Sequence, residues 1–255
     1  MNILITNDDG INSIGLQTLV KHMSLIGDVY VCAPESERSA YSHHFTFKGK
    51  MKFEYRELPF AKKAIALWGT PCDCIHCGLQ FLYKDIKFDL VCSGINKGWN
   101  VLSDAIYSGT VAGAREGFMR GIPSIAVSLD TFEPFDFNYA ASIASKLAIK
   151  HIANKDNDKY FLNINVPALP TEEIKGIQVC NTIGHVSYDE GYYLEDNDIE
   201  TFVCIGDTTM DVTRPEGSDT KALQDGYVSI SPMFIDSVNH EATNLKEIYI
   251  ENKDC

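Results

Sequence analysis

The sequence predicts an α/β fold: a Rossmann-like, doubly wound, mostly parallel sheet in three α/β/α layers, with a C-terminal antiparallel hairpin or arm. Two observations carry this prediction. Up to about Pro170, short apolar runs that end in turn residues alternate with segments of helical period. Beyond Pro170 the helical segments become rare and short strands with polar turns follow. The 255 residues, 45% of them hydrophobic, suffice for a sizeable core.

The chain opens with a strand–helix–strand pattern. Asn2–Thr6 is an apolar run that ends in the turn Asn7-Asp8-Asp9-Gly10, and apolar residues then recur at helical spacing from Leu16 to Met23. Residues 28–32 form a second apolar run, which Pro34 ends. This order predicts two parallel strands joined by a right-handed crossover.

The remaining elements follow from the same patterns. Residues 93–100 are rich in Gly and Asn and predict a loop. We expect residues 1–170 to form the catalytic core, and residues 171–255 to form an extension whose antiparallel arm supports oligomerisation before the chain returns to the core. Further strands are predicted over residues 45–55, 64–67, 88–92, 123–129, 161–166, 177–180, 192–194, 201–204 and 227–230, and helices over residues 72–83, 108–120, 139–153 and 219–224.

Charge and composition exclude some partners. Acidic residues outnumber basic ones by 35 to 22, which gives a net charge of −13, so we expect no long nucleic acid as a partner. No apolar stretch reaches the roughly 18–20 residues of a membrane helix, and the first residues lack the basic region of a signal peptide. We therefore expect a cytoplasmic protein, without membrane contact, whose eight cysteines stay reduced.

Asp8 and Asp9 are the strongest local signal for a site. They follow the first strand, and ligands of open α/β sheets bind outside the carboxyl ends of the strands. Two adjacent carboxylates repel each other unless a cation joins them, and Mg²⁺ prefers such oxygen ligands. The alternative is a solvated turn in which one acid caps the next helix.

Three more polar segments belong at the same edge of the sheet. Ser93-Gly94-Ile95-Asn96 follows a strand, with Asn100 close behind, and offers amide oxygens to a metal. Ser108-Gly109-Thr110 opens a helix, where free N–H groups bind anions. Ser39, beside Arg38, lies in a polar loop after the second strand. Each segment alone is also compatible with an ordinary turn, cap or loop.

These segments, in this order, resemble one known family. The chain contains Ile3-Leu4-Ile5-Thr6-Asn7-Asp8-Asp9-Gly10-Ile11, Ala33-Pro34, Arg38-Ser39, Gly69-Thr70-Pro71, Asp73-Cys74, Ser93-Gly94-Ile95-Asn96, Tyr107-Ser108-Gly109-Thr110-Val111 and Gly226-Tyr227-Val228-Ser229-Ile230. This set is similar to the SurE family, the survival-protein nucleotidases, which are phosphatases of nucleoside monophosphates. The resemblance covers nearly the whole chain.

The resemblance implies a role for each matching residue. Asp8, Asp9, Ser39 and Asn96 would hold one divalent cation per subunit, Mg²⁺ or Mn²⁺, with Asp8 and Asp9 also catalytic. Asn100, Ser108, Gly109 and Thr110 would bind the phosphate. The implied activity is hydrolysis of nucleoside 5′-monophosphates, with 3′-monophosphates and short polyphosphate as further candidates, by a homodimer or homotetramer built through the C-terminal arms.

Some residues depart from the family pattern and bear on substrate preference. Ala40 stands where Gly is frequent, His43-His44 where smaller residues are common, Cys72 where Ala is typical, and Trp99 where acidic or polar residues are usual.

Alternatives remain open for the mechanism and the class. The cation could activate a water molecule, or an Asp could attack phosphorus and form an aspartyl-phosphate. A dehydrogenase would need Gly-x-Gly-x-x-Gly after the first strand, and a haloacid-type phosphatase Asp-x-Asp; the chain has neither there. Cys72, Cys74, His76 and Cys77 could suggest zinc, without a second Cys pair at finger spacing. A nucleotide-binding regulator without turnover is the non-enzymatic alternative.

Overall fold

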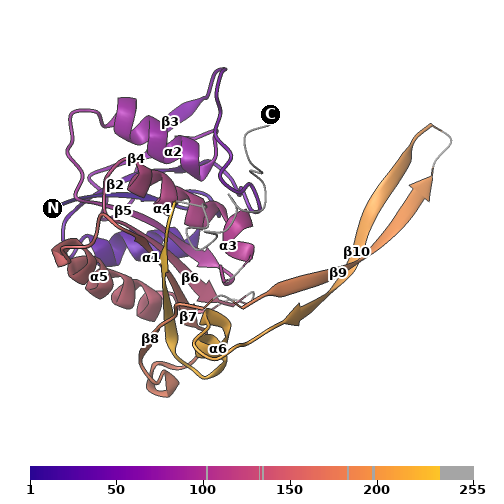
Figure 1. Cartoon of the computed structure of the whole chain (residues 1–255). Coiled ribbons are helices and arrows are strands. Elements are labelled where there is room, and N and C mark those ends of the chain that lie inside the picture. Colours follow the sequence, from indigo (N-terminus) through magenta and orange to yellow (C-terminus); the bar gives the residue numbers. More distant parts are fainter. Residues whose placement is uncertain (102, 132, 134, 183, 197–198, 236–255) are drawn as a thin grey trace, which may run out of the picture.

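A computed structural model describes residues 1–235 except 102, 132, 134, 183, 197 and 198 (Figure 1). The strands are β1 Asn2–Thr6, β2 Asp28–Pro34, β3 Phe53–Arg56, β4 Lys63–Leu67, β5 Leu90–Lys97, β6 Ser124–Asp130, β7 Phe161–Pro167, β8 Ile177–Val179, β9 Val186–Asp196, β10 Thr201–Val212 and β11 Val228–Met233. The helices are α1 Ile14–Met23, α2 Pro71–Cys77, α3 Asp104–Tyr107, α4 Gly109–Met119, α5 Asn138–Ala153 and α6 Asp219–Gln224, with a π-helical turn Gly78–Leu82 and a 3-10 turn Thr171–Glu173.

A nine-stranded sheet of order β3-β4-β2-β1-β5-β6-β7-β11-β8 organises the molecule. The six strands from β4 to β7 run parallel, whereas β3 pairs antiparallel with β4, and β11 pairs antiparallel with β7. The chain thus proceeds outward from β1 in one direction to β4 and in the other from β5 to β7. The predicted doubly wound, mostly parallel fold is confirmed, and its switch point lies between β1 and β5.

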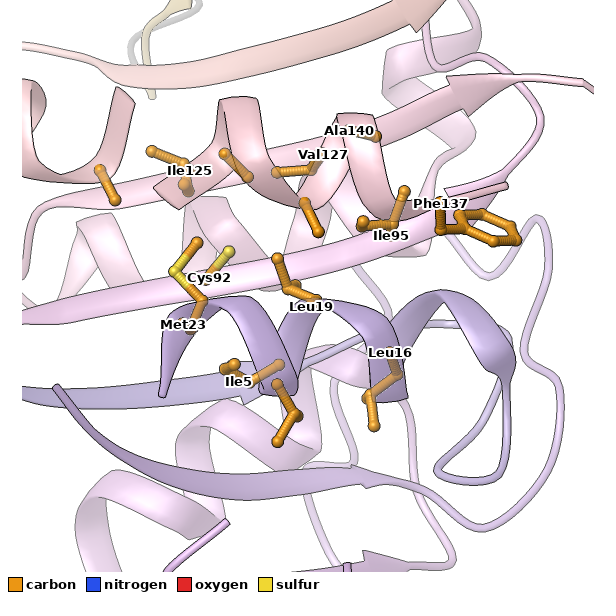
Figure 2. Packing of buried hydrophobic residues seen from close by; sticks show 14 of the residues in the cluster. Ile5, Leu16, Leu19, Met23, Cys92, Ile95, Ile125, Val127, Phe137 and Ala140 are labelled. Atoms are coloured by element: carbon orange, nitrogen blue, oxygen red, sulfur yellow. The ribbon is translucent and has the colours of Figure 1, made fainter. Parts of the chain in front are cut away.

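Helices cover both faces of the sheet and form the outer layers. Helices α1 and α5 pack against each other and onto β5 on one face, and α2 and α4 pack together on the other. Figure 2 shows the first of these cores, where Leu16, Leu19 and Met23 of α1 meet Ile5 and Cys92 of the sheet, all fully buried. Burial of each such large aliphatic side chain contributes about 1.5–3 kcal/mol to folding.

Helix α4 lies unusually close to the sheet because glycines face it. A Cβ added to Gly113 would lie 2.8 Å from Ser93 Oγ, and one added to Gly117 would lie 2.6 Å from Val91 Cβ. Both distances are shorter than carbon atoms tolerate, so only glycine permits this approach. The four-residue spacing of Gly109, Gly113 and Gly117 is therefore a sheet-packing face, as the sequence predicted.

Three predicted elements differ from the structure. Strand β5 extends through Asn96 and Lys97, where a loop was predicted, because this strand lies at the centre of the sheet and pairs with both β1 and β6. The strand predicted over residues 45–55 is only the edge strand β3. The helix predicted over residues 72–83 changes to a π-helical turn at Gly78.

The C-terminal part both rejoins the sheet and leaves it. Strands β8 and β11 extend the main sheet past β7, while β9 and β10 pair with each other as a long antiparallel hairpin that projects from the body of the molecule (Figure 1). This hairpin is much longer than the short strands predicted. The division at residue 170 stays a prediction, and residues 236–255 lie outside the described part. Among the described helices, none has the length and apolar character to cross a membrane.

Candidate active site

A cavity of about 520 Å³ opens beside the switch point of the sheet. It gathers segments that are far apart in the sequence: the end of β1, the loop after β2, the end of β5, helix α3 and strand β9. Its lining residues are Asp8, Ser39, Ala40, Asn96, Lys97, Gly98, Trp99, Asn100, Asp104, Tyr107, Ser108 and Tyr188. Five of the eight predicted site residues are among them.

The turn after β1 fixes Asp8 and Asp9. Asn7 Nδ2 donates to Gly10 O (2.9 Å) and to Ser13 Oγ (2.8 Å), which ties the turn to the start of α1. Gly10 has φ +94°, a conformation that favours glycine. A Cβ there would also lie 3.1 Å from the backbone carbon of Ser36. The sequence thus holds the two acids in a rigid turn, and the alternative that one acid caps α1 is wrong, because Ser13 is the N-cap.

Asp8 is buried against the start of α4. Its Oδ2 accepts the Thr110 N–H at 3.0 Å, and its Oδ1 accepts a short hydrogen bond from the Thr110 hydroxyl. A Cβ on Gly109 would lie 2.9 Å from Asp8 Cβ, so the glycine makes this approach possible. Burial raises the pKa of Asp8 above its ordinary value, and the hydrogen bonds from Thr110 oppose that rise.

Asp9 lies beside Asp8 and faces the end of β5. Its Oδ2 accepts the Lys97 N–H at 3.2 Å. Burial, and next the charge of Asp8, raise the pKa of Asp9 to about 6, against the lowering effect of the Lys97 hydrogen bond. Asp9 is not among the cavity-lining residues. Two adjacent carboxyls whose pKa values are both raised form a pair that a cation would stabilise.

Ser39 and Asn96 line the same cavity as Asp8. The Arg38 N–H donates to Asp8 O at 2.7 Å, which brings the Ser39 loop to the first strand. The Ser39 hydroxyl donates to Glu37 Oε1 at 2.7 Å, and Asn96 Nδ2 donates to Gly98 O at 3.0 Å.

Asn100 is held from behind by residues that the sequence analysis missed. Its N–H donates to Asn165 Oδ1 at 2.7 Å, its Nδ2 donates to Ser128 Oγ at 2.8 Å, and its carbonyl accepts from Asn163 Nδ2 at 2.6 Å. Asn163 and Asn165 alternate with apolar residues along β7. Two amides in an otherwise apolar strand were the signal that could have indicated them.

Of the three residues predicted to bind phosphate at the start of α4, only Ser108 lines the cavity. Its hydroxyl accepts the Val111 N–H at 3.1 Å, so it is the N-cap of α4. Gly109 and Thr110 instead pack on Asp8. Their phosphate-binding role stays a prediction, and their observed role is to position a predicted metal ligand.

The donor set at the switch point fits a hard divalent cation. Asp8 and Asp9 supply carboxylate oxygens, and Ser39 and Asn96 can supply neutral ones, the oxygen chemistry that Mg²⁺ and Mn²⁺ prefer. Within the described residues, no group of three or more His, Cys, Asp or Glu side chains could hold a metal. That search leaves a set of two carboxylates with Ser and Asn uncounted, but it gives no support to zinc at Cys72, Cys74 and Cys77.

Comparison with known proteins agrees with this site. The family described as "Survival protein SurE" matches residues 3–189. A protein of Clostridium botulinum named 5′-nucleotidase SurE is 39% identical, over 98% of this chain and 100% of its own. One of Clostridium beijerinckii with the same name is 41% identical over 92% and 94%. The crystal structure of a SurE protein from Aquifex aeolicus superposes with a TM-score of 0.82 at 33% identity, over 98% of this chain and 100% of that one.

The match therefore spans the sheet, the cavity and most of the hairpin, at an identity too high for a likeness of fold alone. The chain belongs to the SurE family.

Proposed function

We propose that this protein is a 5′-nucleotidase, a phosphomonoesterase that hydrolyses nucleoside 5′-monophosphates and depends on a divalent cation. The observation that carries the proposal is the buried Asp8–Asp9 pair beside the cavity at the switch point of the sheet. The names of the relatives, 5′-nucleotidase SurE, support the same reaction. A volume of about 520 Å³ is within the range of cavities that hold small ligands.

Asp8, Asp9, Ser39 and Asn96 would hold the cation, Mg²⁺ or Mn²⁺, one per subunit. When bound, such a cation polarises a phosphoryl oxygen and lowers the pKa of water at its side. A cation that replaces the proton of Asp9 also keeps both acids ionised.

The chain's own residues would orient the phosphate. Asn100, rigidly held by Asn163, Asn165 and Ser128, is a fixed polar contact in the cavity wall. Ser108 stands at the start of α4, where the helix dipole favours an anion. Thr110 holds the Asp8 carboxylate by two hydrogen bonds, so that its position does not depend on the substrate.

The test is phosphate release from nucleoside 5′- and 3′-monophosphates and short polyphosphate, with Mg²⁺, with Mn²⁺ and with chelator. We expect metal-dependent release that is fastest from 5′-monophosphates. Asp9→Asn should lower kcat/KM by about 100-fold or more while the variant stays folded, in line with loss of a charged group from a catalytic site. Tight nucleotide binding without any release would favour the regulator alternative, and a folded Asp9→Asn variant with full activity would overturn the metal site.

We also propose that the protein is a homodimer or homotetramer assembled through the hairpin. Along β9 and β10, Tyr192, Leu194, Phe202, Val203 and Ile205 are exposed large hydrophobic residues. A contiguous apolar surface of this kind is typical of an interface between subunits. Sedimentation of the intact chain tests this, and a monomer at micromolar concentration would contradict it.

The proposed location is the cytoplasm. The seven cysteines within the described residues are all free, which suits a reducing compartment.

A further inference from the structure

One side of the cavity has no part in holding a cation or a phosphate. Trp99, Tyr107 and Tyr188 contribute aromatic rings there, and Asp104 contributes a carboxylate. Asp104 lies one helical turn before Ser108, since the Ser108 N–H donates to Asp104 O at 3.0 Å. A carboxylate so near the proposed phosphate position would repel a second phosphate, so this side suits the uncharged part of a substrate.

Trp99 is fixed in place by the base of the hairpin. It packs, half-buried, against a cluster of Val101, Val186 and Leu223, while it also lines the cavity. A rigid indole that is held on one side and open to a cavity on the other is suited to stack on a flat ring. Trp99 is also one of the positions at which the sequence departs from the family pattern.

Tyr188 is brought to the cavity by the same strand. Val186 and Tyr188 are two residues apart in β9 and therefore point to the same face of the hairpin. The Tyr188 hydroxyl donates to Asp104 Oδ2 at 2.5 Å, which anchors the ring at the cavity. Burial and this hydrogen bond raise the pKa of Tyr188, so the hydroxyl stays a donor at neutral pH. Asp104 thus serves as a positioning residue for Tyr188.

We propose that Trp99 and Tyr188 form the nucleobase wall of the active site, where the base of the substrate stacks, and that this wall makes the enzyme select nucleoside monophosphates over phosphomonoesters without a ring. The proposal rests on the proposed nucleotidase function and identifies its specificity-determining residues. Base–aromatic stacking is tolerant of the base identity, so we expect all common bases to be accepted.

The first experiment compares kcat/KM for adenosine 5′-monophosphate with that for glycerol 3-phosphate, which has no ring. In Trp99→Leu, kcat/KM for the nucleotide should fall about 10-fold, in line with the loss of one base–aromatic stack, and change less than about 2-fold for glycerol 3-phosphate. Trp99→Phe keeps a ring and should restore most of the nucleotide activity. Tyr188→Phe keeps the ring without the link to Asp104 and should raise KM for the nucleotide with little change in kcat.

An equal loss for both substrates would overturn the proposal, since it would make Trp99 purely structural, and so would unchanged kcat/KM for the nucleotide. If the wild-type protein released phosphate from no substrate, the proposed function would fail, and the wall would be tested by a second measurement that needs no turnover.

That measurement uses the fluorescence of Trp99. The chain has two tryptophans, and the other, Trp68, lies against Lys52, whose Nζ is 4.1 Å from the ring centroid, and does not line the cavity. In a Trp68→Phe background the emission comes from Trp99 alone. Adenosine should quench it saturably, whereas ribose should not. No saturable quenching by adenosine, or equal quenching by ribose, would overturn the wall.

Discussion

Replacement of Thr110 by Val tests how Asp8 is held. Val has nearly the same shape but no hydroxyl, so the change removes one of the two hydrogen bonds to the buried carboxylate and keeps the backbone bond of 3.0 Å. A hydrogen bond to a charged group contributes about 1.5–3 kcal/mol, and its loss leaves a lone pair of Asp8 without water. We expect the free energy of unfolding to fall by about 2 kcal/mol and the melting temperature by about 4–8 °C.

The assay is urea denaturation at neutral pH with chelator, so that no cation compensates the loss. Thr18→Val is the matched control, because Thr18 is also a helical Thr whose hydroxyl donates, to Ile14 O at 2.8 Å, but at the surface of α1. This control should change stability by less than about 0.5 kcal/mol. If Thr110→Val were no more destabilising than the control, the hydroxyl would not be what holds Asp8, and the positioning role of Thr110 would be refuted.

Three further predictions follow from other contacts. Gly109→Ala should shift α4 off Asp8, because its Cβ would lie 2.9 Å from Asp8 Cβ, and so cost about 1–3 kcal/mol by thermal denaturation; a variant as stable and active as the wild type would contradict the steric argument. Burial lowers the pKa of His151 to about 4, so between about pH 6.5 and 4 only the unfolded chain gains this proton, and stability falls with pH. His151→Phe should remove about 3 kcal/mol of that fall between neutral pH and pH 4, and urea titrations with equal slopes for both proteins would contradict it. Asn165→Leu leaves the Asn100 N–H without its acceptor and should raise KM for the nucleotide in steady-state assays; unchanged KM would remove Asn165 from the support of the site.

The elements that the sequence predicted well are those that local pattern determines. The run from Asn2 to Thr6, the turn at Asp8-Asp9 and the apolar spacing of α1 are sufficient for the first strand–helix unit, since each depends on near neighbours. The end of β5 was predicted wrongly because Gly94 and Asn96 have the composition of a turn. Their strand conformation comes from pairing with β6, 28 or more residues away in the chain, and no local pattern carries that pairing.

The candidate site divides in the same way. Asp8, Ser39, Asn96, Asn100 and Ser108 could be placed at one cavity from motif order and the rule that strand ends face the ligand. The sequence analysis did not find the support of Asn100 by Asn163 and Asn165, because more than 60 residues separate them. Tyr188 was missed for a similar reason, since nothing local indicates that the hairpin turns one side chain back toward α3.

Helix α4 shows where this molecule can accept sequence change. Three successive turns present bare backbone to the sheet at Gly109, Gly113 and Gly117, and the first of them sets the distance to Asp8. A single added methyl group on that face would displace the helix that carries Ser108 and Thr110, whereas Met119, half-exposed at its far end, has open space around it. Drift over generations would thus be confined to one side of this helix, and a designer who wishes to alter the enzyme should vary the cavity wall and leave the helix face untouched.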